Sequence, residues 1–210
     1  MAQNMEMKVY IMRHGETDWN ARHLFQGQVN TSLNEKGREQ ARLAKKRVEN
    51  LGLSFDAVYS SPIDRAAQTI EIVTGLSREE IHLDPRLMEM NFGPLDETPF
   101  DKEAPQVGHL FDKPSAYIPP EGAESFSELE ARLSSFMEDL RRNRPGKSIL
   151  VGCHGCSMRV LLVWLRYLEL DEIWNQGIGN CAIIEVTLGE DDVFRVTHMY
   201  DTQDWFGQKS

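Results

Sequence analysis

The chain has little cysteine, no long apolar run and a shortage of positive charge. Its three cysteines, Cys153, Cys156 and Cys181, do not form the even-numbered, widely spaced set typical of a disulfide framework. The longest apolar run, from Val160 to Leu165, is far too short to span a bilayer. No charged and then apolar signal segment precedes the first expected strand. We therefore expect a protein of the reducing cytoplasm.

The shortage of positive charge restricts the partners. Lys and Arg total 23 against 33 Asp and Glu, which gives a formal net charge of −10. A field of this sign repels nucleic acids and anionic membranes, so we expect neither as a partner. It also opposes small phosphorylated ligands, which would need arginines concentrated at one place.

The remaining composition is that of a globular protein, with 40% hydrophobic and 27% charged residues over a length of 210. We expect a single domain over residues 1–210. Strand-like and helix-like patterns alternate, which predicts the α/β class. Strands are expected at 9–12, 57–59, 148–153, 182–188 and 193–200, the last two forming an antiparallel hairpin. Helices are expected between Asn34 and Gly52, after Ser61-Pro62, from Phe126 to a stop at Arg144-Pro145-Gly146, and at 157–168. Asn34 and Ser61 are the expected N-caps.

A proline-rich segment separates the second expected helix from the third. Seven prolines lie between Asp84 and Gly122 and leave little room for regular elements. Its aromatic residues favour a packed loop over a disordered one. We expect a lid or selectivity loop at about 85–122. Lys102, His109 and Lys113 could contact a substrate from this loop or simply face solvent.

Arg13-His14-Gly15 stands where the first strand ends. In open α/β sheets, ligands bind at the carboxyl ends of the strands. Arginine offers a planar fork of donors for phosphate oxygens, and histidine can attack an electrophile and hold the transferred group. An isolated Arg-His pair is equally compatible with a histidine that only bonds a loop carbonyl.

Arg65 takes a similar position on the first turn of the second helix. A helix N-terminus carries roughly half a positive charge, so an arginine there is out of place unless an anion binds nearby. The alternative is a surface arginine paired with Asp64 or Glu71.

Two further residues could belong to the same site. His154, in Gly152-Cys153-His154-Gly155, follows the third expected strand, and Gly155 allows a steep turn into a helix. Glu89 is the only acid in a mainly apolar stretch, where it could serve as a general acid. A buried structural histidine and a solvated loop glutamate are the alternatives.

Four segments in order resemble the histidine phosphatase superfamily, in its phosphoglycerate mutase-like branch. They are Arg13-His14-Gly15-Glu16-Thr17, the string from Ser61 to Thr69, the segment from Leu87 to Gly93, and His154-Gly155. The resemblance implies a three-layer α/β/α sandwich with a mostly parallel central sheet. It also implies a small phosphorylated substrate and no metal or cofactor.

The resemblance implies roles for these residues. His14 would be the nucleophile that forms a phosphohistidine. Arg13, Arg65 and His154 would enclose the phosphoryl oxygens, and Glu89 would donate a proton. The family's phosphate-pocket loop falls on Asn20, Gln26 and Gly27, and Gly155 would complete the phosphate-binding set.

Departures from the family pattern favour a phosphomonoesterase over a mutase. The segment 93–100 is acidic where mutases carry a basic insertion, and Cys156 stands where mutases tend to have asparagine. A phosphoglycerate mutase-type transfer remains the alternative. A Cys-x-x-Cys redox protein built on Cys153 and Cys156, and an inactive phospholigand-binding protein, are further alternatives. Trp164, Trp174 and the Trp205-Phe206 tail could lie in the core or in a homodimer interface.

Overall fold

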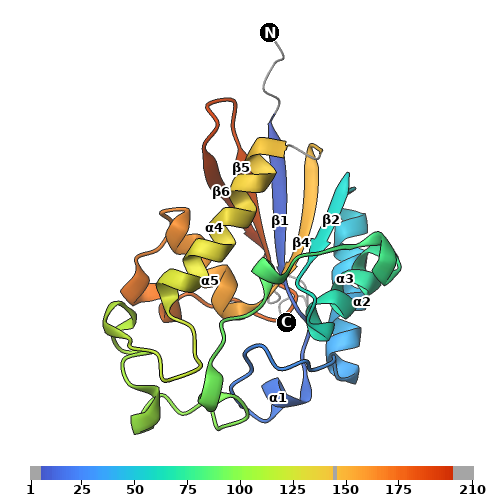
Figure 1. The fold of residues 1–210 in the computed structure, drawn as a ribbon. Helices are drawn as coiled ribbons and strands as arrows, with labels where there is room; N and C mark the ends of the chain where they lie inside the picture. Colours follow the sequence, from blue (N-terminus) through green and yellow to red (C-terminus); the bar gives the residue numbers. More distant parts are fainter. Residues whose placement is uncertain (1–5, 144–145, 201–210) are drawn as a thin grey trace, which may run out of the picture.

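The central element is a sheet with the strand order β3-β2-β4-β1-β5-β6 (Figure 1). The computed structural model describes residues 6–143 and 146–200. Its strands are β1 Met7–Arg13, β2 Ala57–Ser60, β3 His82–Leu83, β4 Ser148–Cys153, β5 Ile183–Leu188 and β6 Phe194–Tyr200. Pairing is parallel from β3 through β2 and β4 to β1, and antiparallel from β1 through β5 to β6. The mostly parallel sheet and the final hairpin are therefore confirmed.

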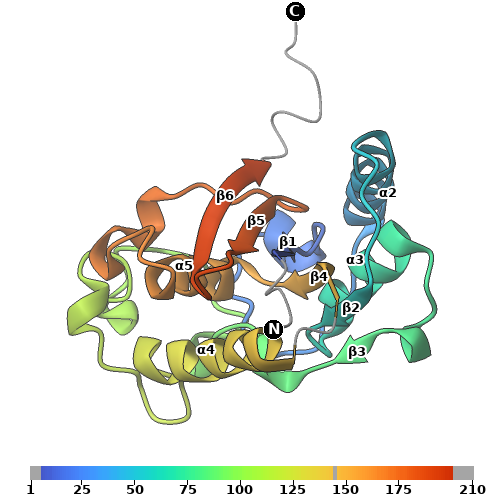
Figure 2. The same ribbon diagram turned by 90° about the horizontal axis from the view of Figure 1, so that it is seen from above.

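Helices cover both faces of this sheet and make three layers (Figure 2). They are α1 Asp18–Ala21, α2 Glu35–Asn50, α3 Asp64–Thr74, α4 Phe126–Asn143 and α5 Gly155–Trp164. Helices α2 and α3 lie on one face and α4 and α5 on the other. Successive residues of β1 enter different apolar clusters, because Val9 and Ile11 face the α4–α5 side while Tyr10 and Met12 face the other. No helix of the described residues is long and apolar enough to cross a membrane.

Two helix starts and one helix end differ from the sequence prediction. Helix α3 begins at Asp64, and its N-cap is Ile63, so the assignment of Ser61 as the cap is wrong. Helix α5 begins at Gly155 and ends at Trp164, earlier at both ends than the predicted 157–168. It ends early because Arg166 adopts a left-handed φ of 57°, which cannot continue a right-handed helix. Helix α2 begins as predicted, with the Asn34 side chain accepting the Gly37 N–H at 2.8 Å.

The segment 85–122 consists of short 3₁₀ turns and packed loops rather than strands or long helices. Part of it pairs with the loop after α1: the Phe25 N–H donates to the Thr98 carbonyl at 2.9 Å, and the Phe100 N–H donates to the His23 carbonyl at 2.7 Å. Both segments lie below the carboxyl ends of β1, β2 and β4 in Figure 1. The proline-rich segment is thus positioned over the sheet edge where the candidate residues lie.

A close backbone contact fixes the loop after β1 against α2. A Cβ atom on Gly37 would lie 2.0 Å from the Glu16 carbonyl oxygen, and one on Gly15 would lie 2.5 Å from the Gly37 carbonyl oxygen. Since no side chain fits between these backbones, the two glycines determine how near α2 comes to His14.

Substitution of Gly37 by alanine tests this contact. Alanine normally stabilises a helix by about 1 kcal/mol over glycine. Here the clash with a backbone oxygen dominates, and we expect Gly37→Ala to lower the free energy of unfolding by about 2 kcal/mol. Chemical denaturation measures this change. Gly177→Ala is the control, because a Cβ atom there meets nothing within 4 Å. A Gly37→Ala protein as stable as the wild type would contradict the contact.

Candidate active site

The residues singled out at three strand ends meet at one edge of the sheet. Arg13 ends β1 and His14 follows it, His154 follows β4, and Arg65 lies on the first turn of α3 after β2. The imidazole rings of His14 and His154 lie 5.3 Å apart between centroids. The two histidines, far apart in the chain, therefore belong to one site.

A cavity of about 450 Å³ opens at this edge. It is lined by Arg13, His14, Glu16, Asn20, His23, Leu24, Phe25, Gln26, Glu89, Phe92, Phe100, Lys102, Gly155, Cys156, Arg159, Trp174 and Asn180. Six of the nine predicted site residues are in this set. The other three, Arg65, His154 and Gly27, are not among the lining residues.

His14 is held as a neutral imidazole with one nitrogen available. Its Nδ1 lies 2.7 Å from the Gly15 carbonyl oxygen, which can only accept, so Nδ1 carries the proton. Burial lowers the pKa of His14 well below its usual value, and the charges of Arg65 and Arg13 lower it further. Its Nε2 therefore keeps a lone pair at neutral pH, which a nucleophile requires.

His154 is held in the same tautomer as His14, but the nitrogen left without a partner is Nδ1 rather than Nε2. Its Nε2 lies 2.8 Å from the Ser61 hydroxyl, while its Nδ1 is buried without a partner among the described residues. The Ser61 oxygen already accepts the Ile63 N–H at 3.3 Å. Since His154 Nε2 is the acceptor in reach of the Ser61 O–H within the described chain, the hydroxyl donates to it and the ring proton resides on Nδ1. Burial, followed by the charge of Arg65, lowers the pKa of His154.

Arg65 is fully buried and has no carboxylate partner within residues 6–143 and 146–200. It donates to the Gly27 carbonyl at 2.6 Å and to the Val29 carbonyl at 2.9 Å. The alternative of surface pairing is wrong, because Asp64 and Glu71 both bind Arg78 instead. Burial lowers the pKa of Arg65 to about 10, which leaves the group charged at neutral pH.

Arg13 adds a second, partly buried guanidinium on the cavity wall. Its Nη1 donates to the Ile178 carbonyl at 2.5 Å, and burial lowers its pKa to about 10. The Nε atoms of Arg13 and Arg65 are both buried without a hydrogen-bond partner among the described residues. Two charged guanidinium groups with unused N–H donors are suited to binding a phosphate group.

Glu89 is bound to the start of α5. One carboxylate oxygen accepts the Ser157 N–H at 2.9 Å and the other accepts the Cys156 N–H at 3.0 Å. The Met90 N–H and the Ser157 hydroxyl also donate to it. The positive end of the helix dipole favours a carboxylate here. Glu89 is only 6% exposed, yet it reaches the cavity, so the solvated-loop alternative is not what the structure shows.

Two amide side chains on the loop after β1 complete this end of the cavity. Asn20 and Thr17 form a capping box at the start of α1. The Gln26 side-chain oxygen accepts hydroxyl hydrogens from Thr17 at 2.8 Å and Thr31 at 2.6 Å. Both amides line the cavity, and their NH₂ groups have no hydrogen-bond partner in the described parts of the chain. They can donate to a bound anion.

Several cavity residues were missed by sequence reasoning. Arg159 was not singled out from the sequence, and Trp174 was assigned to the core or to an interface. Of the lid cations, Lys102 lines the cavity, whereas His109 and Lys113 do not. Trp164 packs against the apolar core through Phe194. Trp205 and Phe206 lie outside the described residues.

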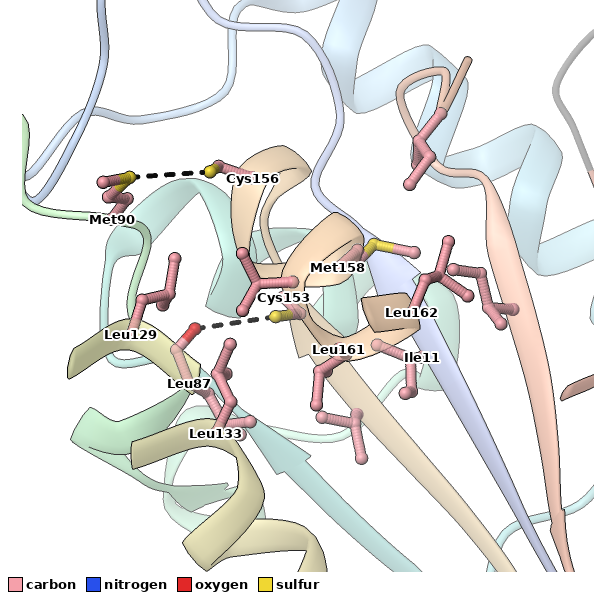
Figure 3. Packing of buried hydrophobic residues seen from close by; sticks show 14 of the residues in the cluster. Ile11, Leu87, Met90, Leu129, Leu133, Cys153, Cys156, Met158, Leu161 and Leu162 are labelled. Atoms are coloured by element: carbon pink, nitrogen blue, oxygen red, sulfur yellow. Dashed lines mark hydrogen bonds between the residues drawn. The ribbon is translucent and has the colours of Figure 1, made fainter. Parts of the chain in front are cut away.

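The cysteines do not form a reactive pair. The thiol of Cys156 contacts the Met90 sulfur, whereas that of Cys153 donates to the Leu87 carbonyl (Figure 3). Burial raises the pKa of Cys153 to about 12 and that of Cys156 well above its usual value. Because the thiolate is the reactive form, this environment does not favour redox chemistry.

No cluster of three or more His, Cys, Asp or Glu side chains in residues 6–143 and 146–200 is arranged to hold a metal ion. The site instead combines neutral imidazoles, guanidinium groups without a carboxylate partner in this part of the chain, and the carboxylates of Glu16 and Glu89. That donor set can bind and transfer a phosphoryl group by nitrogen attack and fixed positive charge.

Comparison with known proteins identifies the family. The model of the histidine phosphatase superfamily (branch 1) matches residues 9–202. The chain belongs to this superfamily, whose enzymes include phosphatases and mutases.

Individual relatives are of both kinds. The chain is 30% identical over 198 residues to a 2,3-bisphosphoglycerate-dependent phosphoglycerate mutase of Bartonella henselae, covering 89% of this chain and 95% of the relative. Among solved structures it is similar to YhfR of Bacillus stearothermophilus, with a TM-score of 0.82, 28% identity, and coverage of 91% of this chain and 95% of that one. A phosphoserine phosphatase of Entamoeba histolytica, solved with phosphoserine, has the same fold, with a TM-score of 0.81, 23% identity, and coverage of 94% and 98%.

The depressed pKa values of the two buried histidines predict the pH dependence of stability. Unfolded histidines bind protons near pH 6.5, but folded His14 and His154 do not. The contribution of these two histidines to the free energy of unfolding is complete above pH 6.5. It is lost as the pH falls toward the pKa values of the folded protein. We expect the free energy of unfolding to fall by up to about 1.4 kcal/mol per pH unit for each histidine in this window. Urea titrations across pH measure it. His14→Gln should reduce the slope and exposed His82→Gln should not; equal slopes would contradict the assignment.

Removal of the Ser61 hydroxyl tests the tautomer of His154. In the wild type we expect the ¹⁵N spectrum of His154 to show a protonated Nδ1 and an unprotonated Nε2. Ser61→Ala removes the donor that fixes this state, so both nitrogens should shift toward a tautomer mixture. Ser61→Thr keeps the hydroxyl and should retain the wild-type pattern. A wild-type spectrum in Ser61→Ala would show that another group fixes the ring.

Proposed function

We propose that the protein is a metal-independent phosphomonoesterase that hydrolyses a small phosphorylated metabolite through a phosphohistidine on His14. The observation that carries the proposal is the state of His14. It is a neutral imidazole whose Nδ1 is bound to a carbonyl, and it lies beside Arg13 and Arg65, which have no carboxylate partner among the described residues. Membership in the superfamily supports the same chemistry.

In the first half of the reaction, His14 Nε2 attacks phosphorus and the bond from phosphorus to the leaving oxygen breaks. Glu89 gives a proton to that oxygen. Arg13, Arg65 and the Nδ1–H of His154 stabilise the charge on the equatorial oxygens of a loose transition state. The NH₂ groups of Asn20 and Gln26 bind the same oxygens.

In the second half, water attacks the phosphohistidine. Glu89 now accepts a proton from the water, the nitrogen–phosphorus bond breaks, and His14 returns to its starting state. Proton balance is complete, because the proton given in the first half is recovered in the second. No group outside the described site is required.

Phosphoglycerate mutase-type transfer is the second candidate, because the Bartonella henselae relative is named as a mutase. A mutase must retain its phosphoenzyme and exclude water. Asp96 lies beside this site, where its carboxylate accepts the Gly27 N–H at 2.6 Å. A carboxylate there disfavours a second phosphate, so hydrolysis is the better-supported function.

Substitution of the nucleophile tests the proposal. We expect His14→Ala to lower kcat/KM for p-nitrophenyl phosphate by about 10³-fold or more, because the covalent route is lost. Phosphate release measures this loss. Acid-labile, base-stable phosphorus should be trapped on wild-type protein and not on the variant. His82→Gln is the matched control and should keep wild-type turnover.

Two outcomes would contradict the proposal. A His14→Ala protein with undiminished turnover would show that His14 is not the nucleophile. Conversion of 3-phosphoglycerate to 2-phosphoglycerate without phosphate release would favour the mutase. A Cys153→Ala, Cys156→Ala protein that retains turnover would eliminate the dithiol alternative.

A further inference from the structure

Arg159 on α5 is a cavity cation that the proposed phosphoryl chemistry does not use. It donates from Nη1 to the Gly155 carbonyl at 2.8 Å and from Nε to the Gln176 carbonyl at 3.2 Å. Its guanidinium carbon stacks 5.4 Å from the ring centre of Trp174. In the described part of the chain it has no carboxylate partner, and its Nη2 makes no hydrogen bond.

Arg159 is a close neighbour of Arg13. The position that a Cβ atom on Gly155 would occupy is 3.3 Å from Arg159 Nη1 and 3.3 Å from Arg13 Nε. The charge of Arg159 helps to lower the pKa of Arg13, as like charges do. Two adjacent cations without a carboxylate partner are costly, because each makes the other harder to keep charged.

Other arginines of the chain do find acids. Arg86 binds Asp84 and Asp139, and Arg132 binds Glu124. With a net charge of −10, the chain has carboxylates to spare. Glu89 is near enough to act on the charge of Arg159, but no carboxylate of the described residues forms an ion pair with it, which leaves its free donors for an anion supplied by a ligand.

The wall around this cation is aromatic. Phe25 lies 4.8 Å from Phe100 and 5.3 Å from Phe92 between ring centres. Trp174 is fixed by its indole N–H, which donates to the Leu110 carbonyl at 2.6 Å. Rigid rings that line a cavity favour a flat apolar body between them.

We infer that the cavity takes a phosphomonoester whose leaving group carries a carboxylate on a flat apolar body, with the carboxylate on Arg159. The inference rests on the proposed function, because it assigns the phosphoryl end to Arg13 and Arg65. We expect the leaving group of this ligand to carry a single negative charge. Arg159 has only its Nη2 side free, which is enough for a carboxylate oxygen but not for a second phosphate dianion.

The experiment compares acids with uncharged isosteres. The probes are 2-, 3- and 4-carboxyphenyl phosphate and the three matching carbamoylphenyl phosphates, which differ only in charge. For at least one position we expect the wild type to prefer the acid by about tenfold to a hundredfold in kcat/KM, as a charge-assisted hydrogen bond provides. In Arg159→Gln the ratio of acid to amide should fall to about one. Any loss common to both isosteres cancels in this ratio.

Two more variants control for folding and for general charge. Arg159→Lys keeps the positive charge but loses the planar set of guanidinium donors. It should therefore retain part of the preference for the acid. Arg142→Gln, on an exposed part of α4, removes one positive charge far from the cavity and should leave the ratio unchanged. Thermal unfolding of each variant shows whether it is folded.

The outcomes separate the inference from the proposed function. If none of the six esters is hydrolysed, the phosphomonoesterase proposal fails. If they are hydrolysed without preference for any acid, or if the preference persists in Arg159→Gln, the carboxylate subsite is wrong. An equal loss for acid and amide in Arg159→Gln would mean that Arg159 acts on the phosphoryl group instead.

Discussion

Arg65 is buried with no acidic partner in the part of the chain that the structure describes, and this is the constraint on which the site depends. An unpaired buried charge is strongly unfavourable unless fixed dipoles replace its water. Here the loop 26–31 turns its backbone so that the carbonyls of Gly27 and Val29 point at the guanidinium. The same turn places Gln26 at the cavity and closes the space that a side chain at position 27 would need. The loop conformation and the charge it solvates therefore determine each other.

This charge also sets the protonation of its neighbours. Arg65 contributes to the lowered pKa of both His14 and His154, so two imidazoles 5.3 Å apart remain neutral together. Neutral rings can then take different tasks according to their hydrogen bonds. A carbonyl accepts from His14 Nδ1, and a hydroxyl donates to His154 Nε2. One ring is left with a lone pair and the other with an N–H, although both residues have the same side chain.

Sequence reasoning located the strand ends and the charged residues on them, because hydrophobic runs and glycine turns are local signals. It could not locate Arg159 or Trp174, which come from α5 and from the 3₁₀ segment Leu170–Asn175 and meet only in three dimensions. Ser61 was assigned as a helix cap for a similar reason. Serine before proline is a common cap, and the competing bond to His154 joins residues 93 positions apart. Glu89 was placed by family resemblance, whereas the bonds that hold it come from α5, 67 and 68 positions later.

The pairing of the proline-rich segment with the loop after α1 has a consequence for engineering the protein. The aromatic surface is built from Phe25 on one segment and Phe100 on the other, joined by backbone hydrogen bonds at 2.7 and 2.9 Å. Those bonds do not depend on side-chain identity. New ring sizes or polar groups can therefore be introduced at position 100 while the framework that holds the histidines and arginines stays in place. The part of the cavity wall that position 100 contributes can therefore be redesigned apart from the cluster of histidines and arginines.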